Sequence, residues 1–182
     1  QIFESVLQAE FNFFQYDVLD FDHRFTPYIT FGIGLFSYNP FTTYDNKIYY
    51  LRALGTEGQQ YEQYKDRRYG QTAIAFPIGA GFKFWVDKGV TFGFEVCNRS
   101  TTTDYIDDVS KTYVGIDKFI DQDNSPYPTP SSLLQDRSPE TGKPAIGLEG
   151  RQRGISSTLD KYMMMQFTLS FRFPTYKCPN FR

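Results

Sequence analysis

Residues 161–173 read KYMMMQFTLSFRF, and this stretch decides the fold because its side chains alternate along the whole length. One face carries Met163, Met165, Phe167, Leu169, Phe171 and Phe173, and the other carries Tyr162, Met164, Gln166, Thr168, Ser170 and Arg172. A period of two residues is that of a β-strand, whose successive side chains point to opposite faces. The unlike composition of the two faces indicates a strand with two different surroundings.

Four other segments repeat this alternation at unusual length and with bulky aromatic side chains. The predicted strands cover about residues 2–14, 26–38, 71–86, 90–105 and 159–173. Such strands are typical of transmembrane barrels, which face lipid outside and a polar lumen inside. The aromatic end of 161–173 also resembles the C-terminal signal by which outer-membrane barrels are recognised for assembly. We therefore predict an all-β, antiparallel transmembrane β-barrel. The side chains expected to face lipid include Phe76, Phe82, Phe94, Phe167 and Phe171.

Length and composition bound the class of protein. The chain has 182 residues, which suggests a single domain. Its 19 Phe and 14 Tyr are an excess that aromatic girdles and a lipid-facing surface explain, and an aromatic-rich soluble β-sandwich is the alternative. No run approaches the roughly 18 apolar residues of a transmembrane helix. A net charge of −2 without a basic block predicts no nucleic-acid partner.

Sequence signals of catalysis are sparse. His23 is the single histidine, and no Gly-x-Ser-x-Gly elbow is present. We therefore predict a protein without enzymatic activity and without a cofactor. Cys97 and Cys178 have neither metal-ligand spacing nor the pattern of a disulfide framework, so we expect separate thiols.

The connections between the predicted strands alternate in length. Residues 15–25 and 87–89 form shorter connections, whereas 39–70 and 106–158 are very long. Outer-membrane barrels have short periplasmic turns and long extracellular loops. With that orientation the first strand begins outside the cell, so an odd number of strands is expected before Gln1. Barrels start at about eight strands, so three missing strands would complete the five in residues 1–173. Residues 174–182 would be a periplasmic tail.

Several short motifs resemble one family over nearly the whole chain. They are Thr26-Pro27-Tyr28, Gly32-Ile33-Gly34, Asn39-Pro40, LGTEGQ at 54–59, PIGAGFK at 77–83, TDYIDDVS at 103–110, Thr112-Tyr113, Arg153-Gly154 and Cys178-Pro179. Together they resemble the PorG family, the outer-membrane barrels of the type IX secretion system. The 54–59 and 103–110 motifs are the specific ones. The family's first strands have no counterpart here, and the chain departs from the family pattern chiefly between Asp121 and Pro130.

That resemblance implies a role and a location. PorG-type proteins are non-catalytic barrels of the cell outer membrane that associate with a periplasmic ring of the lipoprotein PorK and of PorN. The ring belongs to the secretion and gliding machinery. Two alternatives remain open from the residues themselves. One is a general OmpA-like structural barrel without a secretion role, and the other is a soluble lipocalin-like ligand binder.

A periplasmic partner can reach only the short-turn side, which predicts a contact surface there. The candidate residues are Asp17, Asp20, Asp22, His23, Arg24, Asp87, Lys88, Tyr176, Lys177 and Phe181. The acidic side chains of 15–25 suit the steering of a partner, and the tail aromatics suit anchoring in a small interface. The alternative for the tail is that it frays, as chain ends often do.

Four charged side chains are predicted to face the lumen, namely Lys83, Glu95, Arg99 and Arg172. Charges in a narrow interior must pair to offset their desolvation. They could line a conducting path or form a polar plug. Because the interior of a small barrel is filled by side chains, we favour the plug.

Two acidic clusters raise the question of a hard cation. The first comprises Asp104, Asp107 and Asp108, and the second Asp117, Asp121 and Asp123. Calcium needs several converging oxygens, but Pro126 stands where a calcium-binding loop of the EF-hand type needs Gly. We therefore predict loop capping or solvated side chains, and no metal site.

Overall fold

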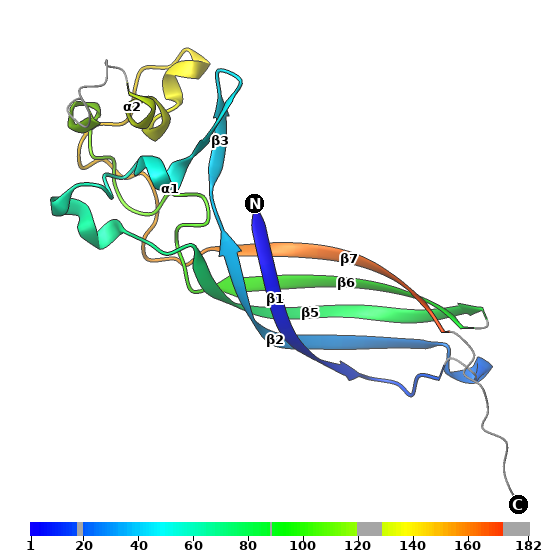
Figure 1. Cartoon of the computed structure of the whole chain (residues 1–182). Helices are drawn as coiled ribbons and strands as arrows, with labels where there is room; N and C mark the ends of the chain where they lie inside the picture. Colours follow the sequence, from blue (N-terminus) through cyan, green and yellow to red (C-terminus); the bar gives the residue numbers. More distant parts are fainter. Residues whose placement is uncertain (18–19, 88, 120–128, 173–182) are drawn as a thin grey trace, which may run out of the picture. The chain divides into compact units, whose positions relative to one another are not determined.

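The computed structural model describes residues 1–17, 20–87, 89–119 and 129–172, with the side chain of Asp87 left out (Figure 1). Its main sheet has the strand order β1-β2-β5-β6-β7. The strands are β1 (Ile2–Asn12), β2 (Phe25–Tyr38), β5 (Thr72–Asp87), β6 (Val90–Thr101) and β7 (Lys161–Phe171). Strands β6 and β7 pair antiparallel, from Val90 opposite Phe171 to Ser100 opposite Lys161. The predicted all-β, antiparallel architecture is confirmed.

Two predicted strands end earlier than expected, and hydroxyl side chains explain where. The predicted strand 2–14 stops at Asn12, after which the backbone N–H of Phe14 donates to Thr26 Oγ1 at 3.1 Å. The predicted strand 90–105 stops at Thr101, whose hydroxyl donates to the backbone oxygens of Thr103 and Asp160. At Phe14 the hydroxyl takes the place of a backbone acceptor, and at Thr101 the hydroxyl shares the Asp160 oxygen with the backbone N–H of the same residue.

The connections contain small elements of their own. A hairpin of β3 (Phe41–Tyr44) and β4 (Lys47–Tyr50) turns at two residues with positive φ, as a tight primed turn requires. The remaining elements are 3-10 turns η1 (Phe21–His23), η2 (Glu62–Arg67), η3 (Ile116–Phe119) and η4 (Ser138–Thr141), and helices α1 (Leu51–Leu54) and α2 (Pro130–Gln135). Among the described residues, no helix is long and apolar enough to cross a membrane.

The chain divides into two compact units. The loop unit comprises residues 1–5, 35–75 and 101–160, and the sheet unit comprises 6–34, 76–100 and 161–182. The core of the loop unit is formed by Phe36, Tyr38 and Ala75, against which Tyr69 and Ile106 pack.

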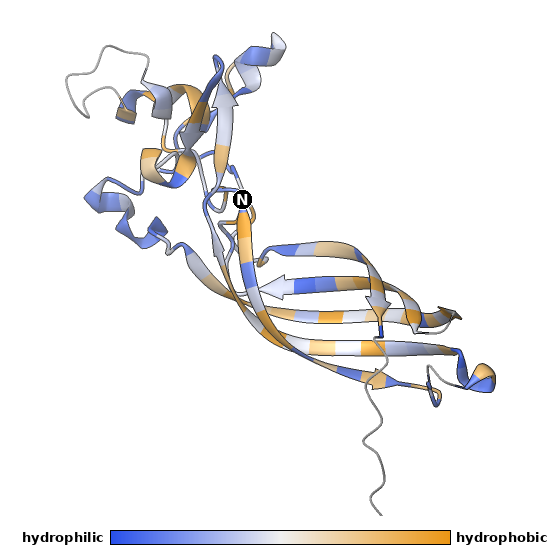
Figure 2. Cartoon of the chain, turned by 45° about the vertical axis from the view of Figure 1, so that its right-hand side comes forward, coloured by the Kyte–Doolittle hydropathy of each residue, from blue (hydrophilic) through white to orange (hydrophobic). Residues whose placement is uncertain are grey.

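The two faces of the sheet unit are inverted relative to a soluble sheet. Outward side chains are large, apolar and exposed, and Figure 2 shows the alternation of hydrophobic and hydrophilic residues along the strands. In β2, Phe31 is 56% exposed, whereas Tyr28 and Thr30 on the opposite face are buried. The same pattern continues in β5, where Phe76 and Phe82 are exposed. A soluble sheet buries its apolar face instead.

Glycine on the inward face makes room for a bulky neighbour. A Cβ at Gly81 would lie 2.3 Å from the backbone oxygen of Phe94 and 2.7 Å from Cζ of Tyr28. No side chain tolerates such contacts, so Gly81 lets the Tyr28 ring lie over β5. The short turn after β5 contains Gly89, whose φ of 89° is a positive value that glycine adopts without strain.

Trp85 is an interior residue that the sequence analysis does not assign. Its side chain is 2% exposed, although it belongs to the mostly small or polar inward face of β5. The ring of Phe21 meets it edge-on at 4.9 Å, and the guanidinium of Arg24 lies over the Phe21 ring at 4.2 Å and over Trp85 at 5.3 Å. The turn η1 therefore packs against Trp85.

Candidate functional site

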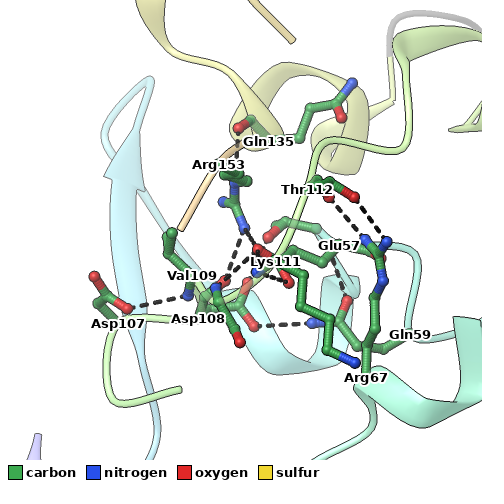
Figure 3. Close-up of polar contacts among 12 residues, drawn as sticks. Glu57, Gln59, Arg67, Asp107, Asp108, Val109, Lys111, Thr112, Gln135 and Arg153 are labelled. Atoms are coloured by element: carbon green, nitrogen blue, oxygen red, sulfur yellow. Dashed lines mark hydrogen bonds and ion pairs between the residues drawn. The ribbon is translucent and has the colours of Figure 1, made fainter. Parts of the chain in front are cut away.

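Three motifs that lie far apart in the sequence meet inside the loop unit (Figure 3). Residues 54–59 contribute Glu57, residues 103–110 contribute Asp108, and Arg153 comes from the Arg-Gly pair near β7. Glu57 and Asp108 are 0% exposed, and the Arg153 side chain is 7% exposed. We call Glu57, Asp108 and Arg153 the loop clamp.

Glu57 is a fully satisfied buried carboxylate. Its Oε1 accepts from the backbone N–H groups of Ser110 at 2.9 Å and Lys111 at 3.1 Å, and from Arg153 Nη1 at 3.3 Å. Gln59 accepts the backbone N–H of Glu57 itself at 2.9 Å. Several donors in good geometry compensate this buried charge. Removal of one donor would leave the charge partly uncompensated, so Glu57 holds these donors together.

Asp108 is the second buried carboxylate of the loop clamp. Its oxygens accept from the hydroxyls of Thr56 and Tyr69, the latter at 2.6 Å, and its backbone oxygen accepts from Arg153 Nη1 at 2.8 Å. Burial raises the pKa of Asp108, and the hydrogen bonds from Thr56 and Tyr69 oppose that rise. Burial and the nearby Asp108 charge likewise raise the pKa of Tyr69.

Two arginines join the loop clamp to surrounding backbone. Arg153 Nε donates to the backbone oxygen of Gln135 at 3.2 Å. Arg67 donates from Nη1 to the backbone oxygens of Thr112 at 2.7 Å and Glu57 at 3.2 Å, and from Nη2 to Thr112 Oγ1 at 2.8 Å. Gly154 next to Arg153 must be small, because a Cβ there would lie 2.6 Å from the backbone oxygen of Ser110.

A stack of tyrosines adjoins these contacts. The Tyr69 ring lies parallel to Tyr105 at 4.5 Å and to Tyr38 at 6.1 Å, and the Tyr38 hydroxyl bonds Thr103 Oγ1 at 2.9 Å. Burial raises the pKa of Tyr105 to about 12. The tyrosines are therefore neutral hydrogen-bonding and packing groups. Together with the loop clamp they make an ordered connection between the two long segments.

The sheet unit contains a polar hollow of about 520 Å³. It is lined by Gln8, Glu10, Tyr16, Tyr28, Thr30, Lys83, Thr91, Gly93, Glu95, Gln166, Thr168 and Ser170. Gln8 Nε2 donates to Glu95 Oε1 at 3.2 Å, and Lys83 pairs with Glu10. These contacts join β1 to β6 and β1 to β5.

The contacts across the hollow show that the sheet is curled. Strands β2 and β5 lie between β1 and β6, so a flat sheet would hold β1 and β6 about 14 Å apart with parallel side chains. The Gln8–Glu95 bond and a 2.8 Å bond between the hydroxyls of Tyr16 and Thr91 require the inward side chains to converge. The inward face is therefore concave.

The predicted lumen residues occupy different places. Lys83 and Glu95 line the hollow. Arg99 is buried, with its guanidinium 5.9 Å from the ring of Tyr162, and is not among the hollow's lining residues. Arg172 is exposed just beyond the end of β7.

Of the predicted partner surface, the described part lies around η1. Asp17 and Asp22 are exposed. Asp20 caps the turn by accepting from the backbone of Asp22 at 3.0 Å and pairs with His23 Nδ1 at 2.7 Å. Arg24 packs on Trp85 as described above. Lys88, Tyr176, Lys177 and Phe181 lie outside the described residues, as does the side chain of Asp87.

Three of the acidic residues considered for calcium have other partners in the structure, and Asp117 is exposed. Asp104 accepts from the hydroxyl of Ser110 at 2.7 Å, Asp107 accepts from the backbone of Val109 at 3.0 Å, and Asp108 belongs to the loop clamp. In the described part of the chain, no group of acidic, His or Cys side chains could hold a metal ion. Asp121, Asp123 and Cys178 fall outside that part, and Cys97 is buried with its Sγ 3.9 Å from the backbone oxygen of Asn98.

These features define the class of the molecule: an antiparallel sheet protein with an apolar outward face, a polar concave face and hydrogen-bonded connecting loops. The family model described as Domain of unknown function (DUF6089) matches residues 1–113, and the chain belongs to that family. The match includes both specific loop motifs, at 54–59 and 103–110, while Arg153 lies beyond it. Comparisons with the curated proteins and with the solved structures gave no match.

Proposed function

We propose that this chain forms part of a non-catalytic β-barrel of the cell outer membrane. In this proposal the barrel belongs to a type IX secretion and gliding machine and associates with a periplasmic ring of a PorK-like lipoprotein and a PorN-like subunit. The strands cross the bilayer, the short turns lie in the periplasm, and the segments 39–70 and 106–158 lie outside the cell.

The observation that carries the membrane part is the inversion of the two faces in the sheet unit. Phe31, Phe76 and Phe167 point outward and are exposed, while charged side chains meet on the concave face. Water would make the outward face costly, whereas lipid makes it favourable. Strand lengths also fit, since β1 and β7 each have 11 residues and a tilted membrane strand needs about 9–11.

The curl of the sheet supports closure into a barrel. Strands β1 and β7 are the two outer strands of the sheet, and their free backbone groups would each cost several kcal/mol in a bilayer. Closure therefore needs further strands between them. Three more would reach about eight, the smallest membrane barrel.

The secretion role rests on the family resemblance, and the loop clamp strengthens its basis. The motifs at 54–59, 103–110 and 153–154 that resemble the PorG family supply Glu57, Asp108 and Arg153. The resemblance therefore concerns residues that organise the fold of the loops rather than aromatic composition alone.

Affinity purification of the tagged full-length protein from native membranes tests the proposal. Recovery of a ring lipoprotein together with a PorN-like subunit is the expected result. Recovery of a membrane-embedded barrel without them would indicate a general OmpA-like structural role. A protein that stays monodisperse without detergent would contradict the membrane assignment and favour a lipocalin-like soluble binder.

A further inference from the structure

The polar hollow of the sheet unit contains an unequal set of charges around one lysine. Glu10, Glu95 and Lys83 are its charged lining residues, so two carboxylates face one ammonium group. Lys83 pairs with Glu10, and its Nζ lies 4.9 Å from the centre of the Tyr28 ring. Glu95 accepts from Gln8 at 3.2 Å, and Tyr28 also lines the hollow.

These side chains form a connected polar layer across the concave face. Lys83 and Glu95 come from β5 and β6, Tyr28 from β2, and Gln8 and Glu10 from β1. The Tyr28 ring lies 4.9 Å from the Lys83 ammonium nitrogen and lines the same hollow as Glu95. The layer therefore joins four strands of one wall by side chains that would otherwise leave an aqueous path.

We infer that this layer is a latch that seals the lumen against ions, and that opening it at Lys83 creates a path for monovalent cations. The inference rests on the proposed barrel. With Lys83 in place, one carboxylate is neutralised and the other accepts a hydrogen bond from the neutral side chain of Gln8. Without Lys83, two carboxylates remain on the concave face without a cation, and they attract one in place of the lost ammonium group.

The hydroxyl and amide groups that line the hollow cannot replace the charge of Lys83. Thr30 lines the hollow with a buried hydroxyl oxygen that has no hydrogen-bond partner in the structure, and Gln166 and Thr168 supply neutral dipoles. Such oxygens are suited to solvating a small cation once the ammonium group is removed. An anion would meet mainly carboxylates and lone pairs there.

Conductance of the full-length barrel in planar lipid bilayers tests the latch. We expect the wild-type protein to insert without conductance steps. Lys83→Met keeps much of the side-chain length but removes the charge, and should give steps that favour potassium over chloride by roughly tenfold. Lys161→Met, at the exposed start of β7, is the matched control and should remain silent.

Two further variants separate the effect of charge from the effect of side-chain volume. Glu10→Gln frees Lys83 without removing it, and should give weaker steps without cation preference. Adding Glu10→Gln and Glu95→Gln to Lys83→Met should abolish the cation preference. Steady wild-type conductance that Lys83→Met leaves unchanged would overturn the latch, as would silence of Lys83→Met in bilayers that contain the inserted barrel. Failure of the wild-type protein to insert, scored by its loss of heat-dependent gel migration, would count against the proposed barrel itself.

Discussion

The sheet unit and the loop unit both place polar groups inside, but they do so in different ways. In the sheet unit, charges meet across a hollow and the outward face is apolar, so its surface suits lipid. In the loop unit, Glu57 and Asp108 are completely buried and each accepts several hydrogen bonds. The loop unit is therefore held together by buried polar contacts, whereas the sheet unit leaves its large apolar side chains exposed.

The largest expected effect comes from breaking the loop clamp. Arg153→Ala leaves Glu57 buried without its cation, and removal of one partner of a buried pair costs about 3–5 kcal/mol. We expect the loop unit to become sensitive to protease while the strands of the sheet unit stay protected. Arg151→Ala, at an exposed neighbouring position, is the control. Equal protease resistance of Arg153→Ala and the wild type would show that the clamp does not hold the loops.

Replacement of one exposed apolar residue in each unit by arginine tests the difference between the units. Phe167 in the sheet unit is 71% exposed and Leu148 in the loop unit is 66% exposed. Phe167→Arg should cost about 2–4 kcal/mol if it lies near the bilayer midplane. Leu148→Arg should change stability by no more than about 0.5 kcal/mol, as at an ordinary surface site. The amount of folded protein recovered from cells measures both, and similar losses would remove the distinction.

A smaller effect is expected from filling the inward face of the sheet unit. Gly81→Ala places a Cβ against the backbone of Phe94, and overpacking of this kind costs about 1–3 kcal/mol. Gly93→Ala is matched, because its Cβ would lie no closer than 3.5 Å to Thr168. Midpoints of thermal unfolding in detergent should fall for the first variant only. An equal fall in the unfolding midpoints of both variants would mean that close packing at Tyr28 does not contribute to stability.

The smallest expected effect is a pH dependence confined to the loop unit. Burial raises the folded pKa of Asp108 above its value in the unfolded chain, so protonation favours the folded form. Its contribution to stability is fully present below the unfolded pKa and is lost as pH rises through the folded pKa. Protease resistance of the loops should therefore increase on mild acidification from neutral pH. Asp108→Asn should reduce that increase, and a variant with an unchanged pH profile would argue against a role of Asp108 in it.

Periodicity predicted the sheet because alternate residues of its strands differ in kind, apolar on the outward face and mostly small or polar on the inward face. Lys83 and Glu95 were assigned to the inward face on that basis, and both line the hollow. The burial of Trp85 could not be predicted in this way. Its large indole lies at an inward position, and Phe21 and Arg24, from the turn before β2, pack against it. The alternation of residues along β5 gives no information about contacts from a turn elsewhere in the chain.

The loop clamp could not be predicted from charge or spacing. Glu57 and Arg153 are 96 positions apart, and each lies in a polar segment where a charged side chain is ordinarily solvated. A local signal did exist in the glycines around Glu57: Gly55 and Gly58 both have positive φ, which marks a tightly specified backbone. That signal identifies an ordered loop but not its partners.

The loop clamp also has a consequence for the order of assembly. A contact over 96 positions is entropically costly to form in an open chain. Pairing of β7 with β6 shortens the effective distance, because it brings Asp160 beside Thr101, where their backbones bond at 3.1 Å. Arg153 can then reach Glu57 by closing a much smaller loop. The clamp is accordingly expected to close after β6 and β7 have paired. Protease should then cut the loops of molecules whose last strand is unpaired and spare completed ones.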